Sequence, residues 1–118
     1  MKAFYVSLAV FSLLIALIVC NGIYVRKATE KTEELLEQAL VSDINSLSPV
    51  ERYWQRTKKM LALTAPFEEI RLFDEHLIAM RAAAKAGAYS DFERSRLLAA
   101  EVLCRIRGQE EFSLDNLL

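Results

Sequence analysis

Glycine, proline, cysteine and histidine are all scarce in this sequence. Three glycines and two prolines in 118 residues leave no glycine-rich phosphate loop and no nucleophile elbow. Of the two cysteines, Cys20 lies in an apolar run and Cys104 in a late helical segment, which fits neither a disulfide framework nor a metal site. The single histidine, His76, excludes a histidine-rich metal site. We therefore expect no metal and no cofactor.

An excess of charge of one sign is also lacking. The formal net charge is −1, and once Lys2 is set aside, 14 basic and 16 acidic residues follow Val25. This balance gives no electrostatic reason to bind nucleic acid. Carboxylates come largely as neighbours, such as Glu68 and Glu69, which point about 100° apart on a helix and do not share one proton-transfer site. Since no acid, base and orienting residue can be assembled, we expect a protein that is not an enzyme.

What the sequence does have is an apolar start, and its portion LIALIVCNG, residues 14–22, has three interpretations. A lipoprotein box would modify Cys20, but it needs a small residue in front, where Val19 stands. A cleaved secretory signal needs small residues three and one before the cut, and the only candidate is the poor site that ends at Gly22. The third interpretation is a helix that stays in the membrane.

A retained anchor explains this segment best. Crossing about 30 Å of hydrocarbon takes roughly 20 apolar residues, and Ala3 to Val25 supplies 23 uncharged positions. Lys2 precedes the run, and Arg26 and Lys27 follow it. We predict a single transmembrane anchor over residues 1–25, in the cell membrane.

The orientation of this anchor is set by two opposing signals. Lys2 against Arg26, Lys27 and Lys31 favours a cytoplasmic C-terminal domain under the positive-inside bias. A two-residue tail with one lysine, followed at once by an apolar stretch, is typical of an export signal that was never cut. We expect the domain on the extracytoplasmic side.

Small side chains mark one face of the anchor. Ala9, Ser12, Ala16 and Cys20 are spaced by three, four and four, so they share a helix face on which another helix could approach closely. The alternative is that these residues simply face lipid. The first interpretation predicts a helix-docking face for a membrane protein partner.

Beyond residue 25, apolar residues recur at spacings of three and four, which predicts amphipathic helices. Two segments with Ser at the cap and Glu three residues later, starting at Ser48 and Ser90, mark helix starts, while Pro66, Gly87 and Gly108 mark ends. The expected helices are about 26–47, 49–63, 67–86 and 91–107, with a short C-terminal turn at 113–118. We predict an all-α protein, in which one N-terminal transmembrane helix continues into a small antiparallel bundle of three to four helices, residues 26–118.

Two further features concern the second helix. Its basic residues are expected to lie beside the glutamates of the first helix and to compensate them across the hairpin; they are Arg52, Arg56, Lys58 and Lys59. Tyr53 and Trp54 are candidates for a ligand or partner groove. At the end of the chain, we expect Phe112, Leu114, Leu117 and Leu118 to fold back on the bundle, with Ser113 capping a final turn.

The order of these features resembles an uncharacterised bacterial family, found mainly in Gram-positive organisms and catalogued as domain of unknown function 4363. The similarity is carried by the N-terminal span, Trp54, Leu63-Thr64, Gly87-Ala88-Tyr89 and the ending EFSLDNLL, and it covers nearly the whole chain. The family's Gly-Asp-Tyr turn is Gly-Ala-Tyr here. The resemblance implies a membrane-anchored helical protein and brings no catalytic residues.

The sequence therefore leads to a function in binding. The favoured hypothesis is a non-catalytic interaction or accessory subunit that holds a protein partner, such as another membrane protein. The alternative is an anchored sensor or small-ligand-binding bundle, with the ligand near Tyr53 and Trp54.

Overall fold

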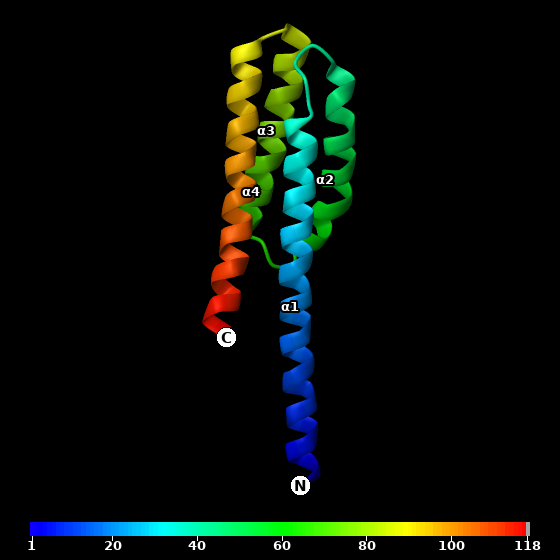
Figure 1. The fold of residues 1–118 in the computed structure, drawn as a ribbon, viewed down its shortest axis with the longest axis vertical. Coiled ribbons are helices and arrows are strands. Elements are labelled where there is room, and N and C mark those ends of the chain that lie inside the picture. The colour runs from blue at the N-terminus through cyan, green and yellow to red at the C-terminus, as the bar shows by residue number, and fades with distance from the viewer. Residues whose placement is uncertain (118) are drawn as a thin grey trace.

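The computed structural model describes residues 1–117, with side chains described as far as Gln109. Within these residues the chain is all-α, as the sequence predicted, with no β-strand. The elements are α1 (Lys2–Glu37), a 3-10 helix η1 (Ile44–Leu47), α2 (Ser48–Leu61), α3 (Phe67–Ala86) and α4 (Tyr89–Leu117). The chain measures 68 × 22 × 20 Å, because the first half of α1 projects alone from one end of a four-helix bundle (Figure 1).

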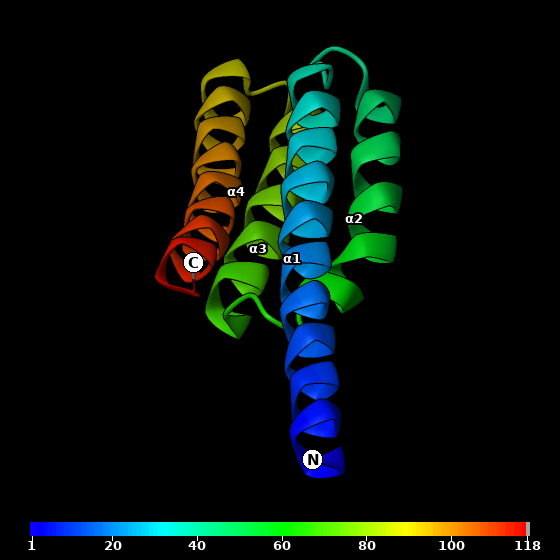
Figure 2. The ribbon, with the colours of Figure 1, turned by 60° about the horizontal axis from the view of Figure 1, so that its bottom comes forward.

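The bundle is antiparallel. From the projecting end α1 runs up, α2 returns, α3 runs up again and α4 comes back down (Figure 1). Seen with that end turned forward, α1 lies in front of α3, with α4 on one side and α2 on the other (Figure 2). Both ends of the chain and the α2–α3 connection therefore lie toward the end from which α1 projects.

α1 combines two different surfaces in one uninterrupted helix. Its apolar window has a mean hydropathy of 2.6 and none of it is buried, so α1 is long and apolar enough to cross a membrane. Bundle packing begins before the boundary at residue 25 that the sequence indicated. Gly22 and Val25 are buried, and Asn21 Nδ2 donates to Thr64 Oγ1 at 3.0 Å. The segment free of the bundle is therefore residues 2–20.

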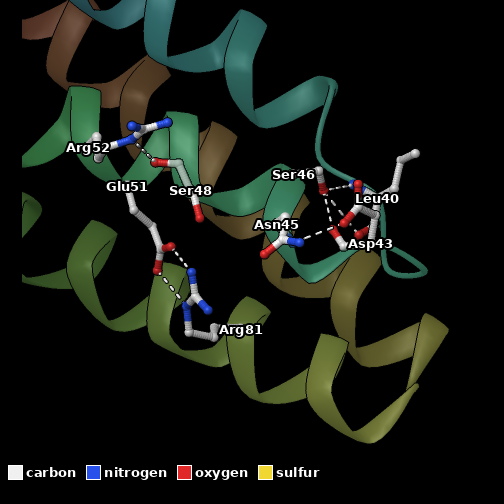
Figure 3. A network of polar contacts seen from close by, with 8 residues as sticks. All are labelled: Leu40, Asp43, Asn45, Ser46, Ser48, Glu51, Arg52 and Arg81. Carbon is white, nitrogen blue, oxygen red and sulfur yellow. Dashed lines mark hydrogen bonds and ion pairs between the residues drawn. The ribbon is translucent and has the colours of Figure 1, made fainter.

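The first helix ends ten residues earlier than the expected bound at residue 47. Ser46 Oγ accepts from the backbone N–H of Leu40 at 2.7 Å and donates to the carbonyls of Leu40 and Asp43, while Asp43 Oδ1 accepts from the N–H of Asn45 at 3.1 Å (Figure 3). These side chains satisfy backbone groups that a longer helix would have used. From α4, Arg96 donates to the carbonyls of Glu37 and Ala39 and so caps the end of α1.

The core lies between the four helices and has Trp54, Phe73 and Phe92 as its largest buried side chains. Around them pack the aliphatic residues Val25, Leu36, Leu47, Val50, Leu61, Ile70, Leu77, Met80, Val102, Leu103 and Ile106. Two threonines of α1 are also fully buried. The hydroxyls of Thr29 and Thr32 donate to backbone carbonyls one turn earlier, at 2.8 and 2.7 Å, so both buried hydroxyls are hydrogen-bonded.

α3 has the bounds expected from the sequence, and it ends at Gly87, whose φ of 65° is the left-handed conformation that favours glycine. α4 does not end at Gly108 as expected. Gly87 is the one glycine with positive φ in the described residues, so Gly108 stays helical and α4 continues to Leu117. A separate turn starting at Ser113 is therefore wrong for the backbone. The expected contacts of the side chains at 112, 114, 117 and 118 lie outside the described residues.

Ion pairs join the helices at their edges. Arg107 of α4 reaches α1, with Nη2 2.6 Å from Glu33 Oε2 and Nε donating to Thr29 Oγ1 at 3.2 Å. Burial lowers the pKa of Arg107, but the hydrogen bond and charge of Glu33 outweigh it, so the net shift is upward. The other links between helices are Arg81 to Glu51, Lys58 to Asp74 and Arg105 to Glu69. None of the ion pairs in the described part of the chain joins α1 to α2, so the expected charge compensation across that hairpin is wrong.

Candidate functional site

The structure presents two surfaces on which a binding partner could act, the bare face of α1 and a groove between α1 and α2. On the first, Ala9, Ser12, Ala16 and Cys20 are all exposed, and one unbroken helix carries them on a common face. No other described part of the chain covers residues 2–20. This face is therefore free for lipid or for a helix of another protein.

Tyr53 and Trp54 do not form one groove. Trp54 is fully buried, with its ring 4.2 Å from that of Phe73, and its Nε1–H donates to Asp74 Oδ1 at 2.6 Å. Tyr53 lies on the side of α2 that lines the groove. Neighbouring positions on a helix point about 100° apart, so one aromatic ring fills the core while the other faces solvent. Trp54 is a structural residue, and Tyr53 alone remains at the candidate site.

The groove beside Tyr53 has a volume of about 750 Å³ and is open to solvent. Lys31 and Leu35 of α1 line it together with residues of α2, namely Pro49, Glu51, Arg52, Tyr53, Gln55 and Arg56. Leu35 and Pro49 supply apolar surface, and Lys31, Arg52 and Arg56 are the basic residues of the lining. The size is in the range of small-molecule sites, although such sites are usually more enclosed.

The residues that line the groove include three basic ones and one acidic one. Its one carboxylate, Glu51, is already paired with Arg81 of α3, whose Nε donates to Glu51 Oε2 at 2.9 Å (Figure 3). Arg52 makes one long contact, from Nε to the carbonyl of Ser48 at 3.4 Å (Figure 3). Among the described residues, Lys31 and Arg56 have no acidic partner. The groove therefore has three basic residues among those that line it, on a surface that is mostly apolar.

Tyr53 is held in an environment that disfavours its ionised form. Burial raises the pKa of Tyr53 above its ordinary value of 10.0, Tyr24 raises it further, and the charge of Arg56 acts in the opposite direction. The phenol is therefore a neutral hydroxyl over the physiological range. It can donate one hydrogen bond to a ligand and accept another.

The remaining chemically interesting side chains do not meet. His76 is half-buried on α3, and Cys20 and Cys104 are both exposed, on α1 and α4. Within the described residues, no group of three or more His, Cys, Asp or Glu side chains is placed to hold a metal ion. Among the described residues, His76, Cys20 and Cys104 therefore lie on three different helices.

Sequence reasoning missed most of the groove. It assigned Arg52 and Arg56 to pairs with the glutamates of the first helix and used Lys31 only in the charge count for the orientation of the anchor. The available signal was their position: Arg52 and Arg56 are one turn apart on α2, as Lys31 and Leu35 are on α1. What the sequence did not show is that Glu33 turns to α4 and Glu51 to α3.

Comparison with family models, curated proteins and solved structures finds no match for this chain. The resemblance to domain of unknown function 4363 therefore stays a prediction that rests on the residues quoted for it.

Proposed function

We propose that this protein is a non-catalytic interaction subunit of a membrane complex, anchored in the cell membrane by a single pass of α1. The observation that carries this proposal is the continuity of α1. One helix of 36 residues is bare and apolar along its first half and is part of the bundle core along its second half. No flexible linker separates the two, so the bundle and the anchor move as one body.

We place the bundle on the extracytoplasmic side. The apolar run then acts as an uncut export signal, in spite of the three basic residues that follow it, Arg26, Lys27 and Lys31. An introduced surface cysteine, labelled in intact cells with Cys104 removed, tests the side. Labelling by a membrane-impermeant reagent supports the proposal, and labelling only after lysis refutes it.

The binding role is supported by how the bundle uses its polar side chains. Several charged side chains form ion pairs that join two helices, such as Arg107 with Glu33 and Arg105 with Glu69. What is left for other molecules is surface, namely the small-residue face of the anchor and the groove at Tyr53. We propose that Ala9, Ser12, Ala16 and Cys20 receive a helix of a membrane protein, because small side chains let two helix backbones approach closely in lipid.

Co-purification in mild detergent tests this docking face. A membrane protein should be recovered with the full-length chain, and Ala16→Ile should reduce its yield because the larger side chain separates the two helices. Ala3→Ile is the matched control, since Ala3 lies about 140° away around the same helix. Equal loss with both variants, or no co-purified membrane protein at all, would refute the docking role.

A second candidate function is favoured by the groove. Among the described residues, the three basic side chains of the groove form no ion pair, and they lie near Tyr53, whose hydroxyl is neutral. This arrangement suits a small anionic ligand, so the bundle could act as an anchored sensor or carrier. The thermal midpoint of the full chain in detergent, measured with inorganic phosphate and with a short poly-glutamate peptide, tests this. A rise that Arg56→Gln removes and Arg94→Gln keeps would support it, because Arg94 is an exposed arginine on α4.

A further inference from the structure

The end of the bundle nearest the anchor has an apolar tip. Two large side chains lie in solvent at this tip: Leu63 in the connection between α2 and α3, at 73% exposure, and Phe67 at the start of α3, at 72%. Figure 1 shows this connection at the level where α1 leaves the bundle. Asn21 fixes that level, because its Nδ2 donates to Thr64 Oγ1 at 3.0 Å. Leu63 and Phe67 therefore project at the height at which the bare part of α1 begins.

The length of the bare segment places this tip relative to a bilayer. Residues 2–20 of α1 span roughly 28 Å at about 1.5 Å per residue. The hydrocarbon core of a bilayer is about 30 Å thick. With Lys2 at one surface, Asn21 reaches the other surface, and the Asn21–Thr64 hydrogen bond holds the α2–α3 connection against it.

The charges around the tip complete a pattern typical of interfacial segments. No charged residue occurs from Met60 to Phe67. In the first turn of α3, directly after Phe67, Glu68 and Glu69 form ion pairs with Arg71 and Arg105, with N to O distances of 2.6 and 3.0 Å. Basic residues stand nearby without such neutralisation. Within the described residues, Lys59 at the end of α2 and Lys27 on α1 have no acidic partner.

An uncharged connection with large exposed apolar side chains is unusual for a segment that faces only water. Single exposed apolar side chains are common on protein surfaces, but here two of the most exposed ones flank one short connection beside a membrane-length helix. Large apolar side chains at an apolar tip, with lysines behind it, suit the boundary between acyl chains and headgroups. The backbone of α4 also runs down past this connection, toward the same end of the molecule (Figure 1).

We infer that the α2–α3 connection is a second membrane contact, in which Leu63 and Phe67 enter the lipid interface while Lys27 and Lys59 lie among anionic headgroups. This inference rests on the proposed anchoring by α1. Two contacts, the span and the tip, fix the tilt of the bundle, which one span alone leaves free. The groove at Tyr53 then faces sideways, at a set height above the bilayer.

The test measures the depth of single labels on the full chain. The two native cysteines are replaced, and Leu63→Cys, Phe67→Cys, Ile78→Cys and Phe11→Cys are labelled one at a time with an environment-sensitive nitrobenzoxadiazole dye. Each protein is reconstituted in phosphatidylcholine and phosphatidylglycerol vesicles that carry quenchers either near the headgroups or deep in the acyl chains. Far-UV circular dichroism checks that every variant remains helical.

Ile78 is the matched control for exposure, at 69%, and lies 11 positions further along α3 from the tip than Phe67. The expected result is a blue shift and loss of emission with the shallow quencher at positions 63 and 67, none at 78, and loss with the deep quencher at 11. Quenching at 11, with 63 and 67 behaving like 78, would overturn the second contact and leave the anchor intact. A blue shift at 63 and 67 without quenching would show cover by protein and also overturn it. Absence of quenching at 11 would overturn the anchor and this inference together.

Discussion

Trp54 provides a direct test of how the core is built. Its indole N–H is buried and donates to the carboxylate of Asp74, which also receives Lys58 at 3.4 Å. A buried indole N–H needs an acceptor, and this acceptor is 20 positions away, on α3. The substitution Trp54→Phe keeps a ring against Phe73 but removes the N–H and the second ring.

The expected loss follows from two contributions. A hydrogen bond to a charged group is worth about 1.5–3 kcal/mol, and since the Asp74 side chain is 31% exposed and keeps Lys58, we expect about 1–2 kcal/mol here. The missing ring takes about 40 Å² of apolar surface from the core, or about 1 kcal/mol at ~25 cal/mol/Å². Together the free energy of unfolding should fall by about 2–3 kcal/mol. At about 4–8 °C per kcal/mol, the melting temperature should fall by about 10–20 °C.

A double-mutant cycle separates the two contributions. Unfolding of the wild type, Trp54→Phe, Asp74→Ala and the double variant is followed in detergent by far-UV circular dichroism, because Trp54 is the one tryptophan and its fluorescence is lost in the two variants that carry Trp54→Phe. The hydrogen bond predicts a coupling energy of about 1–2 kcal/mol between the two positions. If Trp54→Phe costs the same with and without Asp74, the link between α2 and α3 is not the reason for the buried indole.

Three further predictions test the helices and the groove. Chemical denaturation should show that Gly108→Ala raises the free energy of unfolding by about 0.5–1 kcal/mol, because position 108 is helical and has open space around it. Gly87→Ala should lower it by about 1–2 kcal/mol, because residue 87 has a φ of 65°. If both variants lower the free energy of unfolding, α4 ends at residue 108. Arg107→Met should cost about 1–2 kcal/mol through its bonds to α1, and markedly less in a Glu33→Gln background. The difference between the absorbance titrations of the wild type and of Tyr53→Phe should give a pKa of Tyr53 above 10.0 in the folded state. Since the folded pKa is raised, the contribution of Tyr53 protonation to stability is complete below pH 10.0 and is lost as pH rises through the folded pKa.

The local sequence was informative wherever the signal is itself local. The bounds of α3 follow from Pro66 on one side and Gly87 on the other. Its apolar residues at spacings of three and four form the buried face, which includes Phe73 and Met80. The end of α1 was missed because it depends on distant groups. Arg96, nearly 60 positions away, binds the last carbonyls of α1, and no pattern in residues 26–47 reports that contact.

The candidate site shows the same division. Periodicity placed Ala9 and Ala16 on one face of a helix, as the structure does. It could not separate Tyr53 from Trp54, because both are large aromatic residues with a polar group and either could face a core. Burial of Trp54 is decided by an acceptor on another helix, Asp74, and not by anything in the sequence around it. Charge pairing failed for a similar reason, since Glu33 has its arginine on α4.

The distribution of ion pairs also says where binding would matter most. Described pairs link α1 to α4, α2 to α3 and α3 to α4. No described ion pair joins α1 to α2, and the groove lies between these two helices, with basic residues of both in its lining. An anion bound between Lys31 and Arg56 would supply the missing electrostatic link and hold α2 more firmly against α1. Under the proposed anchoring by α1, a molecule bound at this seam would act directly on the proposed membrane helix.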